Sequence, residues 1–237
     1  MSRETENAKP AGAGRPIVCY VTDRQGLEGS DPVVALISSV RGAIAGGVDW
    51  VQIREKDLSS RDLLRIASAA VAAAKEQDRP GLDKARVVVN DRLDVALAAG
   101  ASGVHLGGES IPAVEVASWR RSGDAPAGFF IGVSCHSLAD ARKAEAAGAS
   151  YAAFGPVFDT PSKRPFGAPQ GMARLAEVCG SVRIPVIAIG GVDDENAAEC
   201  LRAGAAGIAA IRMFQESRGA KQLAERIAAL HALRARA

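Results

Sequence analysis

Short apolar runs alternate along the chain with longer Ala-rich stretches of helical periodicity. Four runs each follow a recurring segment in which glycine ends a helix, at residues 46–51, 99–104, 147–152 and 203–208. The other four runs lie between these segments, at residues 17–21, 87–89, 129–133 and 185–189. Glycine supplies the left-handed cap that an αβ connection needs. The pattern therefore predicts eight short strands that alternate with eight helical stretches.

The runs are continuously apolar, which is typical of strands covered on both faces in a parallel sheet. Eight repeats in 237 residues fit an α/β protein with a single (β/α)8 barrel, a TIM barrel, and an open doubly wound sheet is the alternative. We expect the barrel to span residues 16–237 as one domain. Residues 1–15 lack periodicity, so we expect a disordered arm there and assign it no function.

Composition narrows the functional classes. The formal net charge is +2 and no basic run is present, which argues against a nucleic-acid partner. No apolar run approaches the roughly 20 residues of a membrane span, and the start lacks the apolar core of a signal peptide. We therefore expect a soluble, cytoplasmic protein without membrane contact. Cys19, Cys135, Cys179 and Cys200 are scattered, which indicates buried thiols instead of zinc ligands or disulfides.

The second predicted strand carries more charge than a buried strand should. It starts at residues 48–51 and continues into Gln52, Ile53, Arg54, Glu55 and Lys56. Because strand side chains alternate between two faces, Gln52, Arg54 and Lys56 should point the same way. Burying unpaired charge is costly, so the pattern indicates either an exposed edge strand or a strand that ends in an anion site. A closed barrel has no edge strand, and this favours the anion site.

Polar residues also follow the other predicted strands, at the carboxyl ends where barrels build their active sites. The candidates at these ends are Asn90, Asp91, His105, Ser134, His136, Thr160, Ser162, Lys163, Gly190 and Arg212. Asp91 has the hard oxygen donors that Mg²⁺ prefers, but it could equally cap the helix that begins near Leu93. The spacing leaves both roles open.

Three further features allow two interpretations each. The segment 159–163 offers two hydroxyls and an ammonium to a phosphate, or it is an ordinary turn. Gly190 and Gly191 either let backbone amides approach an anion or form a tight turn from strand to helix. His105 and His136 are isolated histidines, which serve in proton transfer or as hydrogen-bonded core residues.

Seven segments form an ordered set: residues 52–56, 89–92, 103–107, 132–136, 154–158, 160–163 and 189–191. With this set, residues 17–214 resemble the superfamily of (β/α)8 barrels that contains thiamine phosphate synthase and thiazole tautomerase. The resemblance implies a transferase of thiamine biosynthesis that condenses hydroxymethylpyrimidine diphosphate with thiazole phosphate. It also implies a dissociative mechanism. Loss of pyrophosphate generates a pyrimidine-methyl cation, and the thiazole nitrogen captures this cation. Such a displacement requires the charge of the leaving group to be neutralised.

The resemblance also assigns roles to residues. It implies that the pyrimidine and its diphosphate are held by Gln52, Arg54, Lys56, Asn90, Ser134 and Lys163. It implies that the thiazole phosphate is surrounded by Thr160, Ser162, Gly190, Ile211 and Arg212. Asp91 is expected to bind the cofactor Mg²⁺. We expect Lys163, Arg54 and His136 to take part in catalysis.

Two positions depart from the synthase pattern. Ser110 stands where the family usually has a second carboxylate for Mg²⁺, and a neutral hydroxyl is a weaker partner for this ion. Arg212 stands where the eighth strand usually ends in serine, so a guanidinium either binds the phosphate more strongly or fills its pocket.

These departures keep two alternatives open. One is a thiazole tautomerase that rearranges carboxythiazole phosphate with His136 as proton carrier. The other is a non-catalytic barrel that binds a phosphorylated heterocycle. The intact set of Gln52, Arg54 and Lys56, together with Asp91, favours the synthase, because a tautomerase has no diphosphate to hold. The sequence does not determine the oligomeric state, so a homo-oligomer remains open.

Overall fold

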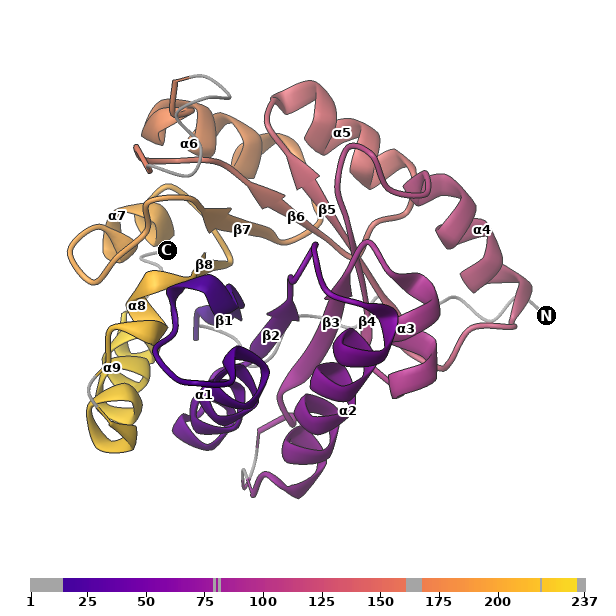
Figure 1. Cartoon of the computed structure of the whole chain (residues 1–237). Helices are drawn as coiled ribbons and strands as arrows, with labels where there is room; N and C mark the ends of the chain where they lie inside the picture. Colours follow the sequence, from indigo (N-terminus) through magenta and orange to yellow (C-terminus); the bar gives the residue numbers. More distant parts are fainter. Residues whose placement is uncertain (1–14, 79, 81, 161–167, 218, 234–237) are drawn as a thin grey trace.

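The chain folds into a closed barrel of eight parallel strands (Figure 1). The computed structural model describes residues 15–78, 80, 82–160, 168–217 and 219–233. The strands are β1 (Ile17–Val21), β2 (Trp50–Ile53), β3 (Arg86–Asn90), β4 (Gly103–Leu106), β5 (Phe130–Cys135), β6 (Tyr151–Phe154), β7 (Val186–Ile189) and β8 (Gly207–Ala210). Each strand pairs with the next along the chain, and β8 pairs with β1. The predicted (β/α)8 barrel is confirmed, and the open sheet is excluded.

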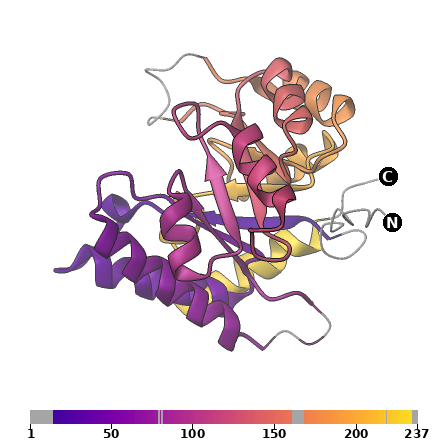
Figure 2. The same cartoon turned by 90° about the vertical axis from the view of Figure 1, so that its right-hand side faces the viewer.

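Helices surround the barrel on its outside, and the view turned by 90° shows several of them packed along its flank (Figure 2). They are α1 (Pro32–Gly46), α2 (Ser60–Glu76), α3 (Leu93–Ala99), α4 (Ala113–Ser122), α5 (Leu138–Ala146), α6 (Gly171–Ser181), α7 (Ala197–Arg202), α8 (Arg212–Gln215) and α9 (Ala220–Ala232), with a 3-10 turn η1 (Arg24–Gly26) after β1. Within the described ranges, no helix has the length and apolarity to cross a membrane.

The connections between helices and the following strands use glycine as predicted. Gly47, Gly100, Gly148 and Gly204 have φ values of 103°, 65°, 89° and 99°. These left-handed conformations are strained for residues with a Cβ atom, so glycine ends the helix where the chain must turn into the next strand. The repeated glycine segment thus marks four of the αβ connections correctly.

The apolar side chains form two cores. Outward-facing strand residues such as Val51 and Ile53 pack against the helices. Inward-facing residues fill the barrel itself, and Trp50 packs there against Tyr151 and Phe130, with ring centroids 4.7 and 5.9 Å apart. The barrel interior is therefore a packed core at its amino-terminal end, as expected for this fold.

The amino-terminal end of the barrel is also tied to the last helix. The buried Asp49 accepts hydrogen bonds from the backbone N–H of Val18 at 2.9 Å and from His231 Nε2 at 2.8 Å. Arg15 forms an ion pair with the same carboxylate. The predicted disordered arm, residues 1–15, lies outside the described residues except for Arg15 and stays a prediction there.

Glycine at position 132 makes room for the interior aromatic cluster. A Cβ atom added to Gly132 would lie 2.2 Å from Tyr151 Cζ. We therefore expect Gly132→Ala to lower the free energy of unfolding by about 1–3 kcal/mol or more, because overpacking displaces the Tyr151 ring. The measurement is the midpoint of urea unfolding.

The matched control for this prediction is Gly180→Ala in α6. A Cβ atom at Gly180 would meet nothing within 4 Å, so the free energy of unfolding should stay equal or rise by about 0.5 kcal/mol. Equal unfolding midpoints for the two variants would contradict the proposed role of Gly132.

Candidate active site

A chain of side-chain hydrogen bonds joins the carboxyl ends of β2 and β3. Gln52 Nε2 donates to Asn90 Oδ1 at 3.1 Å, and Asn90 Nδ2 donates to Asp91 Oδ2 at 2.6 Å. Gln52 is buried, and on β2 it follows Trp50 by two residues, so both side chains face the barrel interior. The structure therefore brings together three of the predicted site residues.

Asp91 extends this chain to the end of β4. Its Oδ1 accepts hydrogen bonds from the backbone N–H of Gly107 at 3.2 Å and from Ser110 Oγ. Among the described residues other than glycine, Asp91 alone has a positive φ, of 61°. Such a conformation is unfavourable for aspartate, and the hydrogen bonds to its carboxylate hold it in place.

The alternative role for Asp91, as a helix cap, is wrong. Arg92 occupies the N-cap position of α3, and no side chain caps that helix. The Asp91 carboxylate instead crosses to the loop after β4, where Gly107 N–H also donates to Ser110 Oγ at 2.6 Å. Ser110 is therefore a direct hydrogen-bond partner of Asp91.

His105 lies buried inside the barrel, next to this group. Its Nδ1 lies 3.0 Å from the hydroxyl of Tyr151, and its Nε2 lies 2.9 Å from Ser134 Oγ. Burial lowers the pKa of His105 to about 4, while the nearby charges of Asp91 and Arg54 raise and lower it respectively. A neutral imidazole thus connects the aromatic core to Ser134, which supports the interpretation of His105 as a hydrogen-bonded core residue.

The strand alternation predicted for residues 52–56 ends early. β2 stops at Ile53, so Arg54 and Lys56 follow the strand and Lys56 is exposed in a turn. The backbone N–H of Arg54 donates to Thr22 Oγ1 at 2.9 Å, and Arg54 is half-buried. Of Gln52, Arg54 and Lys56, only Gln52 lies within the strand. The prediction that the three side chains share one face of a strand is therefore wrong.

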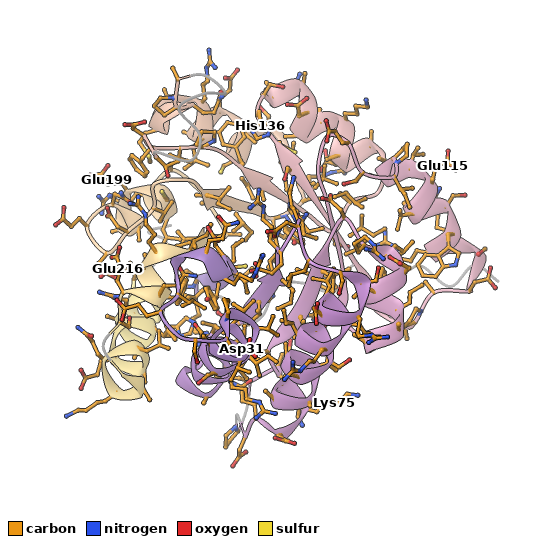
Figure 3. The ribbon with its side chains drawn as sticks, viewed as in Figure 1. Asp31, Lys75, Glu115, His136, Glu199 and Glu216 are labelled. Carbon is orange, nitrogen blue, oxygen red and sulfur yellow. The ribbon has the colours of Figure 1, made fainter. Side chains whose placement is uncertain are left out.

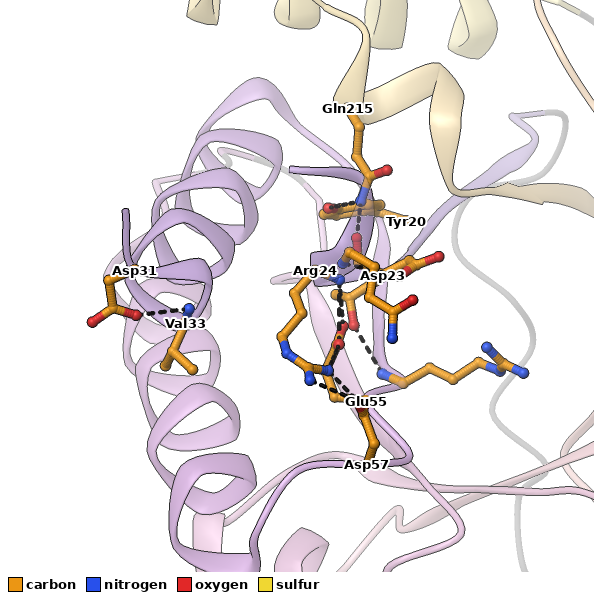
Figure 4. A network of polar contacts seen from close by, with 11 residues as sticks. Tyr20, Asp23, Arg24, Asp31, Val33, Glu55, Asp57 and Gln215 are labelled. Atoms are coloured by element: carbon orange, nitrogen blue, oxygen red, sulfur yellow. Dashed lines mark hydrogen bonds and ion pairs between the residues drawn. The ribbon is translucent and has the colours of Figure 1, made fainter. Parts of the chain in front are cut away.

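Two further residues, Glu55 and Arg24, lie beside these groups and were not among the predicted site residues. Glu55 is buried, and its carboxylate accepts hydrogen bonds from the backbone and the guanidinium of Arg24 (Figure 4). The same guanidinium binds Asp57 through two hydrogen bonds of 2.6 Å. Positive and negative side chains alternate along residues 54–57. This pattern could have indicated that a cation from elsewhere in the chain pairs with the two carboxylates.

His136 lies on the connection between β5 and α5 (Figure 3) and is exposed. Its Nδ1 is hydrogen-bonded to the backbone carbonyl of Gly155, and its backbone N–H donates to Asp140 Oδ2 at 3.0 Å. Because a carbonyl oxygen only accepts, Nδ1 must carry a proton. The accepting position of a neutral ring is then Nε2.

The turn after β7 packs against the loop after β6. Gly190 and Gly191 have φ values of 93° and 69°, and Cβ atoms there would lie 2.5 Å from Pro156 Cα and 2.7 Å from the Asp159 carbonyl oxygen. Phe158 N–H donates to the carbonyl of Gly190 at 2.9 Å. The contacts explain why this tight turn requires glycine, and its use as a phosphate site stays a prediction.

The remaining predicted residues are spread over two loops. Thr160 is half-buried in the loop after β6, whereas Ser162 and Lys163 lie outside the described residues. Ile211 follows β8 and packs against the barrel interior. Arg212 is exposed and begins α8 shortly after β8 ends at Ala210, and its role at a phosphate stays a prediction.

The carboxylate of Asp91 is the best candidate for a metal ligand. A carboxylate offers about four lone-pair positions, and the three hydrogen bonds described above use only part of them. In the part of the chain that the structure describes, three or more His, Cys, Asp or Glu side chains do not gather as a metal-binding group. The cysteines are free thiols, and burial raises the pKa of Cys135, close to the site, to about 12.

The fold and the polar groups at the carboxyl ends of its strands define a barrel of the enzyme type. The chain belongs to the thiamine monophosphate synthase family, which matches residues 18–214.

Three known proteins illustrate this membership. The chain is 45% identical to the thiamine-phosphate synthase of Methanoculleus marisnigri, over 81% of this chain and 88% of the relative. It is 39% identical to the thiamine-phosphate synthase of a Roseiflexus species, over 85% of this chain and 78% of the relative. Among solved structures, thiamine phosphate pyrophosphorylase from Pyrococcus furiosus matches with a TM-score of 0.75 and 33% identity, covering 92% of this chain and 96% of that one.

The low pKa of His105 predicts a specific dependence of stability on pH. Because its pKa is about 4 in the folded protein and about 6.5 in an unfolded chain, the unfolded state binds an extra proton between these values. The contribution of the neutral His105 side chain to the free energy of unfolding is therefore complete above pH 6.5, and it is lost as the pH falls towards 4.

We expect the native protein to lose about 3 kcal/mol of unfolding free energy between pH 7 and pH 4 through this group. His105→Gln should lack this contribution, so its pH profile should be flatter by that amount. Urea unfolding at several pH values measures both profiles. Parallel profiles would show that His105 is not held neutral by burial.

Proposed function

We propose that this protein is a thiamine phosphate synthase, a transferase that condenses hydroxymethylpyrimidine diphosphate with thiazole phosphate and releases pyrophosphate. The hydrogen-bonded group of Gln52, Asn90 and Asp91 is the observation that carries the proposal. It lies at the end of the barrel where such folds bind substrates, in a chain 45% identical to a thiamine-phosphate synthase. Side-chain amides offer donors and acceptors, as an aminopyrimidine ring requires.

The proposed pyrimidine subsite uses neutral groups. Gln52 and Asn90 fix each other's amide orientation, so their remaining donors and acceptors are directed before substrate arrives. His105 holds Ser134 by a hydrogen bond and is itself held by Tyr151. A preorganised polar site avoids the cost of ordering these side chains during the reaction.

The proposed diphosphate subsite uses cations. Arg54 comes directly after β2 and two residues after Gln52, so it lies near the pyrimidine subsite. Lys56 follows two residues later, and Lys163 is the third cation in the proposal. In a dissociative displacement, negative charge accumulates on the departing pyrophosphate, and charge-assisted hydrogen bonds from these cations stabilise it. The thiazole phosphate would then bind beside Thr160, Ser162, Gly190, Ile211 and Arg212.

Asp91 suits the Mg²⁺ ion that this reaction would use. Mg²⁺ commonly binds one or two carboxylates together with substrate phosphates and water, so a single aspartate is compatible with it. Ser110 would hold Asp91 from the second side. When bound, the ion supplies positive charge that neutralises the diphosphate.

The activity test uses purified protein with both substrates and Mg²⁺. We expect equal amounts of thiamine phosphate and pyrophosphate, and no product when either substrate is omitted. Arg54→Gln should lower kcat/KM by about 100-fold, because a charge-assisted contact to the diphosphate is worth about 1.5–3 kcal/mol. The exposed Arg41 of α1 provides the control, and Arg41→Gln should leave kcat/KM unchanged.

Two other results would decide against the synthase. Rearrangement of carboxythiazole phosphate without any condensation would identify a tautomerase. Binding of a phosphorylated heterocycle without turnover of either kind would identify a non-catalytic barrel.

Ser110 offers a direct test of the metal site. Ser110→Asp adds a second carboxylate beside Asp91 and should tighten Mn²⁺ binding by about tenfold or more, because hard cations favour paired carboxylates. Ser110→Ala removes only the hydroxyl and is the matched control. Electron paramagnetic resonance of free Mn²⁺ measures affinity without reference to activity. Equal affinity in all three proteins would place the metal away from Asp91.

A further inference from the structure

The segment that carries Arg54 and Lys56 also carries two carboxylates. Residues 54–57 read Arg, Glu, Lys, Asp, so their four charges sum to zero. Glu55 is buried, while Asp57 is exposed. Without further compensation, the carboxylates would repel an approaching diphosphate and compete with it for the two cations. If the segment is to hold an anion, an additional positive charge must therefore compensate the two carboxylates.

Arg24 supplies that charge from the 3-10 turn after β1. Its guanidinium binds Glu55 Oε2 at 3.1 Å and both oxygens of Asp57 at 2.6 Å (Figure 4). Its backbone N–H lies 3.2 Å from each oxygen of Glu55. The paired hydrogen bonds to Asp57 are the bidentate geometry in which arginine binds carboxylates most strongly.

The ion pairs affect both carboxylates. The hydrogen bonds from Arg24 lower the pKa of Asp57 to about 2, so this group is charged at neutral pH. Only 2% of the Glu55 side chain and 16% of the Arg24 side chain are exposed. A buried carboxylate left without its partner is strongly unfavourable, so Glu55 requires Arg24.

Arg24 is itself held in position from two sides. Asp23 caps the 3-10 turn, with Oδ1 accepting from Gln25 N–H at 3.1 Å, and Gln215 Nε2 of α8 donates to the Asp23 carbonyl at 2.6 Å. On the other side, Thr22 Oγ1 accepts the backbone N–H of Arg54 at 2.9 Å. The loop after β1 is thus fixed both to α8 and to the start of the segment that it compensates.

We propose that Arg24 is a positioning residue for the anion site: it binds Glu55 and Asp57, and thereby leaves Arg54 and Lys56 oriented and available for the diphosphate. This inference rests on the proposed function for the identity of the anion. Arg24 acts through the segment 54–57 and not by contact with substrate. Its removal changes the net charge of the five side chains from +1 to 0 and frees the segment that it holds.

The experiment measures binding of inorganic pyrophosphate by calorimetry in the presence of Mg²⁺, and kinetics with both substrates. We expect Arg24→Gln to weaken pyrophosphate binding by about tenfold and to raise KM for the pyrimidine diphosphate similarly, because unscreened carboxylates then face the anion. KM for the thiazole phosphate should change less than about twofold. Arg24→Lys keeps the charge but loses the bidentate geometry. Its affinity for pyrophosphate should therefore lie between that of the native protein and that of Arg24→Gln.

A structural control separates this role from simple stability. Arg120 makes three hydrogen bonds, to Phe129 O, Ser150 Oγ and Gly148 O, at the amino ends of β5 and β6, away from the site. Arg120→Gln should lower the melting temperature and leave pyrophosphate affinity unchanged. An equal loss of affinity in Arg120→Gln and Arg24→Gln would overturn the positioning role.

A rescue variant tests the mechanism by which Arg24 acts. In Arg24→Gln combined with Glu55→Gln and Asp57→Asn, the carboxylates that Arg24 compensates are gone, and the amide oxygen introduced at position 55 can still accept the backbone N–H of residue 24. We expect pyrophosphate affinity to recover to within about threefold of the native value, since the coupling lies between these three side chains. Continued weak binding by a folded triple variant would indicate that Arg24 contacts the anion directly, and it would overturn the proposal.

The outcomes distinguish this inference from the proposed function. If the native protein binds no pyrophosphate, the anion site itself fails, and the synthase proposal fails with it. If the native protein and Arg24→Gln bind pyrophosphate equally well, only the positioning role of Arg24 fails. Should Arg24→Gln not fold, the triple variant remains informative, because it lacks Arg24 together with the two carboxylates that Arg24 binds. Near-native pyrophosphate affinity of the triple variant supports the proposal, and weak binding by this folded variant would overturn it.

Discussion

The closure of the barrel around its interior aromatic side chains is the constraint on which the site depends. Glycine at inward-facing positions 103, 132 and 207 lets neighbouring strands and rings approach to distances that a Cβ atom would prevent. The Tyr151 ring occupies the space that Gly132 leaves, and it packs against Trp50. Because the Tyr151 hydroxyl reaches His105, and His105 reaches Ser134, packing in the core determines the position of a polar group in the site.

The site has a neutral part and a charged part, built by different strands. Neutral hydrogen-bonding groups from β2 to β6 converge inside the barrel, where burial keeps His105 uncharged. The cations follow β2 at the rim, where Arg24 compensates the carboxylates beside them. This separation suits a substrate with an uncharged ring and a charged diphosphate. It also follows from solvation, since charges are stable at a hydrated rim and costly in the interior.

The sequence predicted the barrel well because its signals are local. Apolar runs and helix-ending glycines indicated all eight strands, and their polar ends correctly indicated that Gln52, Asn90 and Asp91 meet. The error arose where local geometry changed, because strand alternation was extended to Lys56 although the strand ends at Ile53.

By itself, the sequence determined the fold class and the end of the barrel that carries polar groups, because strand and helix periodicities are local properties. Only the tertiary structure decided which partners these groups take. Asp91 has two interpretations until the loop after β4 brings Ser110, 19 residues later, to its carboxylate. The same holds for Arg24 and Glu55, which are 31 residues apart. Such pairs form because consecutive strands pair in parallel, so the loops that follow them lie side by side although a whole helix separates them in sequence. A local pattern of residues contains no information about this pairing.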